Sequence, residues 1–129
     1  MATIVFCEDQ ELVRQVISAA MKSTPHQIEV AADGQDGLDL IVRLRPDLIV
    51  TDVVMPRMGG FQLAAAVRRA PSLRHIPIAF MTASLQPDEV AQLAAHGGVA
   101  HIAKPFSPNE LRETISEILA GTHGSVTAR

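Results

Sequence analysis

Short apolar runs alternate with helical patterns from one end of the chain to the other. Five runs are interpreted as strands, and four of them are almost continuously apolar, which is typical of strands covered on both faces of a parallel sheet. These runs span residues 4–7, 28–31, 48–51, 78–81 and 99–102.

Five further stretches repeat apolar residues at helical spacing. Their stripes consist of Leu12, Val13, Val16, Ile17 and Ala20; of Leu38, Ile41 and Val42; of Phe61, Ala64, Ala65 and Val67; of Val90, Leu93 and Ala94; and of Leu111, Ile115, Ile118 and Leu119. Ser107-Pro108-Asn109-Glu110 supplies the last helix with a capping box and a proline in its first turn. Strict alternation predicts an α/β fold, a doubly wound, five-stranded parallel sheet with right-handed crossovers and helices on both faces.

Domain organisation follows from the same pattern. Residues 1–120 are expected to form one domain, and the small, polar residues 121–129 a flexible tail or the start of a linker. The chain of 129 residues is 47% apolar, which suffices for a continuous core, although only 3% is aromatic. The single cysteine, Cys7, lies within an apolar run, so we expect a buried thiol rather than a catalyst.

Charge and hydropathy exclude two kinds of partner. The net charge of −3 argues against a general nucleic-acid binder, and the one basic doublet, Arg68-Arg69, is expected on a solvated helix face. We find neither a signal peptide nor an apolar stretch of spanning length, so we expect a soluble cytoplasmic protein without membrane contact.

Chemically active residues follow four of the predicted strands. Glu8-Asp9 follow the first, Asp52 the third and Thr82 the fourth, while Lys104 comes shortly after the fifth. Each has an ordinary explanation: Asp9 could cap a helix, Asp52 could open a turn, Thr82 could be a β-branched strand residue, and Lys104 could lie on the surface. Open α/β sheets gather ligands beyond the carboxyl ends of their strands, however, and the four positions meet there.

The chemistry of these groups explains why they would occur together. Three clustered carboxylates repel one another, which raises their pKa values unless a cation compensates. Mg²⁺ prefers such oxygen ligands. Asp52 could then act as a nucleophile that forms an aspartyl phosphate, while Lys104 and the Thr82 hydroxyl bind phosphoryl oxygens.

Over residues 3–119 the chain resembles the receiver domains of two-component response regulators. The motifs that carry the resemblance are Glu8-Asp9, Asp52-Val53-Val54-Met55-Pro56-Arg57-Met58-Gly59-Gly60, Met81-Thr82-Ala83 and Lys104-Pro105-Phe106. The resemblance implies a sheet of order 2-1-3-4-5 and a cis Lys104–Pro105 bond. It implies that Asp52 is the phosphoacceptor and that Mg²⁺ is held by Asp9 and Asp52 directly, by Glu8 through water and by the Val54 carbonyl. It further implies that Thr82, Ala83 and Lys104 bind the phosphoryl group.

The family's function implies the partners. A sensor histidine kinase or a histidine phosphotransfer protein would supply the phosphoryl group. The output would pass to a downstream protein or to a second copy of the chain through the face of the fourth helix, fifth strand and fifth helix. Such a domain is a signalling switch rather than a turnover enzyme.

Three positions depart from the usual family pattern. Glu8 stands where Asp is commoner. Val54 is apolar where many relatives are polar, so Val54 and Ser84, which border the path of attacking water by resemblance, are expected to tune dephosphorylation. By resemblance, His101 occupies the position of an aromatic switch residue that moves together with Thr82, so we expect it to transmit the phosphorylation state; the alternative is a solvent-exposed histidine on an edge strand without a switching role.

Rival interpretations differ in their residue requirements. A haloacid-dehalogenase-type hydrolase needs a second Asp where Val54 stands, a flavodoxin-like binder needs a phosphate loop after the first strand, and a Rossmann domain needs a Gly-x-Gly-x-x-Gly turn. The histidines, including His96 and His101, show no zinc spacing. A degenerate receiver that binds proteins independently of phosphorylation remains the open alternative.

Overall fold

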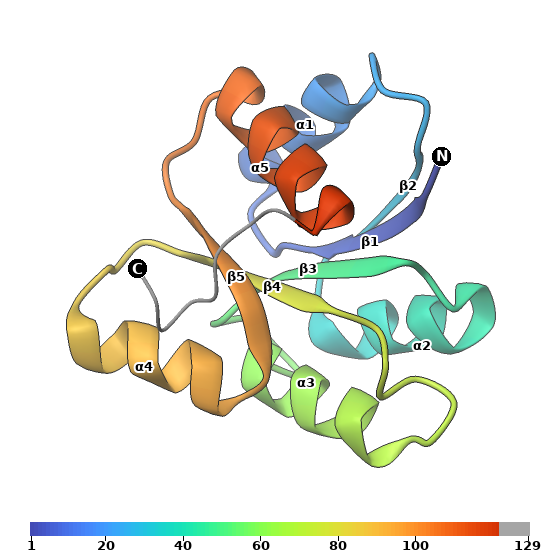
Figure 1. Cartoon of the computed structure of the whole chain (residues 1–129), viewed down its shortest axis with the longest axis vertical. Coiled ribbons are helices and arrows are strands. Elements are labelled where there is room, and N and C mark those ends of the chain that lie inside the picture. The colour runs from blue at the N-terminus through green and yellow to red at the C-terminus, as the bar shows by residue number, and fades with distance from the viewer. Residues whose placement is uncertain (122–129) are drawn as a thin grey trace.

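The computed structural model describes residues 1–121 (Figure 1). The elements in chain order are β1 (Thr3–Cys7), α1 (Glu11–Met21), β2 (Gln27–Ala31), α2 (Gly34–Leu44), β3 (Leu48–Asp52), α3 (Gly60–Arg69), β4 (Ile78–Thr82), α4 (Pro87–Ala95), β5 (Gly98–Ala103) and α5 (Pro108–Ala120). Each of the five predicted strands and five predicted helices is present. The tail expected at 121–129 lies, apart from its first residue, outside the described residues.

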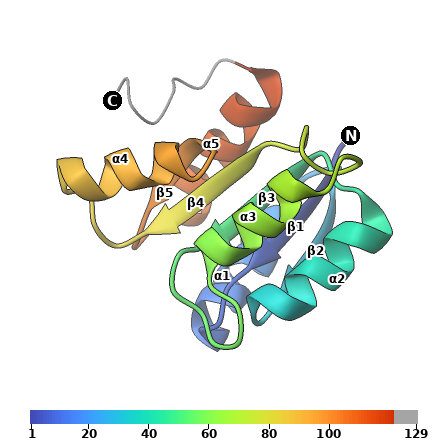
Figure 2. The same ribbon diagram turned by 90° about the horizontal axis from the view of Figure 1, so that it is seen from below.

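The five strands form one parallel sheet in the order β2-β1-β3-β4-β5, which confirms the expected order. Helices α1 and α5 cover one face, and α2, α3 and α4 cover the other (Figures 1 and 2). Because all strands run in parallel, their carboxyl ends lie along one edge of the sheet, where β1 and β3 are direct neighbours.

A separate core fills each side of the sheet, because successive residues of a strand point to opposite faces. In β1, Ile4 and Phe6 join the core beneath α1 and α5, whereas Val5 and Cys7 join the core beneath α2, α3 and α4. All four are fully buried, which explains why the strand is continuously apolar. The Cys7 thiol is inaccessible, as expected, and burial raises its pKa to about 12.

Four predicted stripe residues are exposed rather than in the core, namely Leu12, Val16, Val42 and Ala65. Leu12 is 76% exposed and Val42 57% exposed, while Ile17, Ala20 and Met21 make the buried face of α1. Leu12 belongs to the first turn of α1, at the edge where the strands end, and it borders a surface groove there instead of the sheet. Helical spacing alone cannot distinguish such a position from a buried one.

Arg68 was expected on a solvated helix face, and this prediction is wrong. Its half-buried guanidinium donates to the carbonyl oxygens of Arg74 and Ile76, both at 2.8 Å, and of Gly97 at 3.1 Å. Burial lowers the pKa of Arg68 accordingly. The side chain therefore ties α3 to the segment before β4 and to the turn between α4 and β5, whereas Arg69 is exposed as predicted.

Candidate functional site

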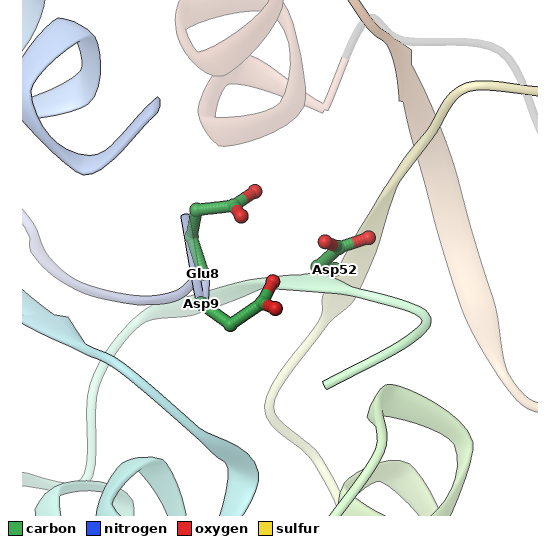
Figure 3. A group of neighbouring side chains, drawn as sticks. All are labelled: Glu8, Asp9 and Asp52. Carbon is green, nitrogen blue, oxygen red and sulfur yellow. The ribbon is translucent and has the colours of Figure 1, made fainter. Parts of the chain in front are cut away.

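Three carboxylates meet at the carboxyl ends of β1 and β3. Glu8 and Asp9 directly follow β1, and Asp52 is the last residue of β3. Each offers an oxygen that lies within 4.8 Å of the other two, and the three side chains gather at one place (Figure 3). The convergence expected from the sequence is therefore present, and it arises because β1 and β3 are paired neighbours.

Glu8 is the buried member of this cluster, with no exposed surface. One carboxylate oxygen lies 2.5 Å from the Lys104 ammonium, and the other accepts a hydrogen bond from the Gln10 amide at 2.9 Å. Burial raises the pKa of Glu8, although the Lys104 and Gln10 contacts act in the opposite direction. Burial therefore opposes ionisation of Glu8, while the Lys104 and Gln10 contacts favour it.

Lys104 follows β5 and connects two of the acids. Its ammonium lies 2.9 Å from the second oxygen of Asp52 in addition to its contact with Glu8. Burial alone would lower the pKa of Lys104, but the pairs with Glu8 and Asp52 outweigh it, and the pKa is raised. The backbone amide of Lys104 donates to the Thr82 carbonyl at 2.8 Å, and the bond to Pro105 is cis, as the resemblance implied.

Asp52 is half-buried and stands at the start of a closed loop. Its first carboxylate oxygen accepts a hydrogen bond from the Val53 amide at 2.8 Å. The Gly60 amide donates to the Val53 carbonyl at 2.8 Å, so α3 begins directly beside the strand end. A Cβ at Gly60 would lie only 2.2 Å from the Asp52 carbonyl oxygen, which means that this approach requires glycine.

The remaining predicted site residues surround this cluster. The Thr82 hydroxyl both donates to the Ser84 carbonyl and accepts from the Ser84 amide, at 3.1 Å each. Ala83 is exposed, and the Val54 side chain is 78% exposed in the loop after Asp52. His101 is half-buried on β5, which is an edge strand.

Asp9 is the exposed acid of the cluster and does not cap α1. The N-cap of that helix is Gln10, whose side chain makes no capping hydrogen bond. The alternative explanation of Asp9 as a helix cap is therefore wrong, and its carboxylate stays available beside Asp52.

The structure adds a feature that the sequence did not indicate. A groove of about 370 Å³ borders Lys104, and its lining is mainly apolar. The lining residues are Gln10, Leu12, Val13, Val16, Ala83, Lys104, Pro105 and Phe106. The sequence did contain a sign of this groove, namely the apolar residues Leu12 and Val16. Their helical spacing, however, favours assignment to the core.

The donor set fits a hard divalent cation. Carboxylate oxygens are the ligands that Mg²⁺ prefers, and Asp9 and Asp52 are accessible enough to bind it while water fills other positions. Sulfur or imidazole ligands, which would favour zinc, are absent from this cluster of described residues.

The fold and this site define a class, the doubly wound α/β proteins that bind ligands beyond the carboxyl ends of their strands. Within that class the chain belongs to the response regulator receiver domain family, whose model matches residues 4–116.

Solved and curated relatives agree with this family. The structure of the chemotaxis response regulator CheY4 of Vibrio cholerae has a TM-score of 0.86 and 31% identity, over 92% of this chain and 98% of that one. Over 91% of the length of this chain, its sequence is 36% identical to that of the sensor histidine kinase TmoS of Ectopseudomonas mendocina. It is 34% identical to the transcriptional regulatory protein RprY of Bacteroides fragilis over 94% of its length. The chain spans 12% of TmoS and 50% of RprY. Among residues 1–121, no helix is long and apolar enough to cross a membrane.

Proposed function

We propose that this receiver domain is a phosphorylation-dependent switch that accepts a phosphoryl group on Asp52 in the presence of Mg²⁺. The observation that carries the proposal is the Lys104 ammonium, held within 3 Å of both Glu8 and Asp52 beside the accessible carboxylate of Asp9. Phosphoryl transfer requires a nucleophile beside a positive charge, and Asp52 and Lys104 supply these at one edge of the sheet.

The transfer itself needs little from the protein beyond positioning. A carboxylate oxygen of Asp52 forms a bond to phosphorus, and the bond between phosphorus and a donor imidazole nitrogen breaks. The electron pair stays on that nitrogen. Bound Mg²⁺, held by Asp9, Asp52, the Val54 carbonyl and, through water, Glu8, would neutralise charge on the phosphoryl oxygens.

Lys104, Thr82 and Ala83 would bind the transferred group. The Lys104 ammonium already contacts Asp52, so it need only shift from a carboxylate oxygen to a phosphoryl oxygen. The Thr82 hydroxyl would exchange its contacts with Ser84 for one with the phosphoryl group. Val54 and Ser84 would set the lifetime of the aspartyl phosphate, and His101 would respond to the movement of Thr82.

A sensor histidine kinase or a histidine phosphotransfer protein would be the donor, in the cytoplasm. The groove beside Lys104 supports this, because it offers apolar surface next to the acceptor without burying Asp52. The output would leave through α4, β5 and α5, either to a downstream protein or to a second copy of the chain. The chain covers 12% of TmoS and 50% of RprY, so those names describe proteins larger than this domain. The proposal concerns the receiver domain itself.

Phosphorylation by acetyl phosphate tests the proposal. The wild type should gain one phosphoryl group only when Mg²⁺ is present, and D52N should gain none, because the amide cannot attack phosphorus. D47N is the matched control, since Asp47 is an exposed aspartate that follows α2 and should not matter. In the same assay, V54N should lose its label faster than the wild type.

Two results would overturn the assignment. Label on D52N would place the modification elsewhere. A folded wild type that resists phosphorylation by acetyl phosphate and by kinases would identify a degenerate receiver.

A further inference from the structure

The loop between β3 and α3, residues 53–59, is held at both of its ends. The Gly60 amide donates to the Val53 carbonyl at 2.8 Å, and the Gly34 amide at the start of α2 donates to the Met58 carbonyl at 3.1 Å. A Cβ at Gly34 would lie 2.1 Å from the Met58 carbonyl oxygen, so α2 and this loop are in close contact. The loop begins directly after the proposed phosphoacceptor.

Arg57 adopts an unfavourable backbone conformation within this loop. Its φ is 67°, and the Met58 amide donates to the Pro56 carbonyl at 2.7 Å, which closes a three-residue turn around Arg57. Three-residue turns with a positive φ are rare and strained, and glycine adopts this region far more easily than arginine. The backbone therefore does not explain why arginine occupies the position.

The side chain of Arg57 offers an explanation. Its guanidinium lies 3.1 Å from one carboxylate oxygen of Asp33 and 3.6 Å from Asp36. Asp33 is 7% exposed and caps α2, because its other oxygen accepts a hydrogen bond from the Asp36 amide at 2.8 Å. One end of the ion pair is thus a buried carboxylate in a fixed position, and the other belongs to the strained turn.

We propose that Arg57 is a positioning residue for the cation site, and that its pair with Asp33 holds the β3–α3 loop against α2. The same loop carries Val54, whose carbonyl is a proposed Mg²⁺ ligand. The strain at Arg57 is tolerated because the ion pair keeps the loop in a single conformation before the cation binds. The inference rests on the proposed function, since it assigns a role toward the proposed metal site.

Two variants remove the pair in different ways. R57G deletes the guanidinium and relieves the backbone, so its melting temperature should not fall. D33N keeps the oxygen that caps α2 and removes only the negative charge. Unlike R57G, it adds no glycine and therefore no backbone flexibility to the loop. R45G is the matched control, because Arg45 also has a positive φ, of 47°, but lies at the opposite end of α2.

Binding of Mg²⁺ alone, measured by calorimetry, and amide hydrogen exchange of residues 53–59 are the readouts. R57G and D33N should each raise the Mg²⁺ dissociation constant by about three- to tenfold, less than for a residue that contacts a ligand directly. Loop exchange should be faster in both. The double variant should be no worse than either single variant, R57K should restore most of the affinity, and R45G should match the wild type.

Wild-type affinity together with unchanged loop exchange in both R57G and D33N would overturn the inference. So would an equal loss of affinity in R45G. If the wild type itself does not bind Mg²⁺, the proposed metal site is wrong and Arg57 positions no cation, whereas loop exchange in D33N would still show whether the tie exists.

Discussion

Gly60 offers a direct test of how closely α3 must approach β3, the strand that carries the proposed phosphoacceptor. In G60A the new Cβ would lie 2.2 Å from the Asp52 carbonyl oxygen, well inside the 3.4 Å at which ordinary contacts begin. It would also lie 3.1 Å from the Asp52 carbonyl carbon and from the Val53 Cα. All three atoms are backbone, so no side-chain rotation can relieve the contact.

The size of the effect follows from two opposing contributions. Overpacking of this kind costs about 1–3 kcal/mol, and the conflict with backbone puts G60A at the upper end of that range. Gly60 is the first residue of α3, so alanine recovers at most about 0.5 kcal/mol there, the lower end of the value for a helix interior. The free energy of unfolding should therefore fall by about 2 kcal/mol, and a displacement of Asp52 by about 1 Å should slow phosphorylation by up to about 100-fold.

G59A, one residue before α3, is the matched control. Its Cβ would lie 3.1 Å from the Val53 carbonyl oxygen, so a shift of a few tenths of an ångström suffices. The loss of stability should stay below about 1 kcal/mol. Urea denaturation followed by circular dichroism suits a chain without Trp or Tyr, and acetyl phosphate gives the rates. Equal stability and equal rates for G60A and G59A would refute the reasoning.

Three further predictions concern stability. Burial raises the pKa of Glu8, so its stabilising contribution is fully present below the unfolded pKa and is lost as the pH rises through the higher folded value. Without Mg²⁺, the stability of E8Q relative to the wild type should therefore increase as the pH rises. Urea titrations that give an equal difference at every pH would contradict this. R68A loses hydrogen bonds to three carbonyl oxygens and should cost about 2–3 kcal/mol in urea denaturation, whereas R69A should change stability by less than about 0.5 kcal/mol; similar losses would contradict the anchoring role. A Cβ at Gly37 would lie 2.3 Å from the Cys7 sulfur, so G37A should be destabilised by about 1–2 kcal/mol and C7A should rescue it; strictly additive effects in the double-mutant cycle would show that the two residues do not meet.

The local pattern of apolar and polar residues alone predicted the succession of strands and helices along the chain and the edge of the sheet at which the site lies. The strands are nearly continuous in apolar residues because helices cover both faces of the sheet. Each strand can therefore be recognised in the sequence as a short apolar run. Parallel strands bring their carboxyl ends together, so Glu8, Asp9, Asp52 and Lys104 could be placed at one edge before any contact was known.

Tertiary structure decided which of these groups touch and which apolar residues stay at the surface. Leu12 has the helical spacing of a core residue, yet it lies beyond the sheet and borders a groove, because periodicity records direction around a helix and not what faces it. The pairs of Lys104 with Glu8 and of Arg57 with Asp33 join residues far apart in the chain. Such contacts depend on which elements become neighbours, and no local pattern carries that information.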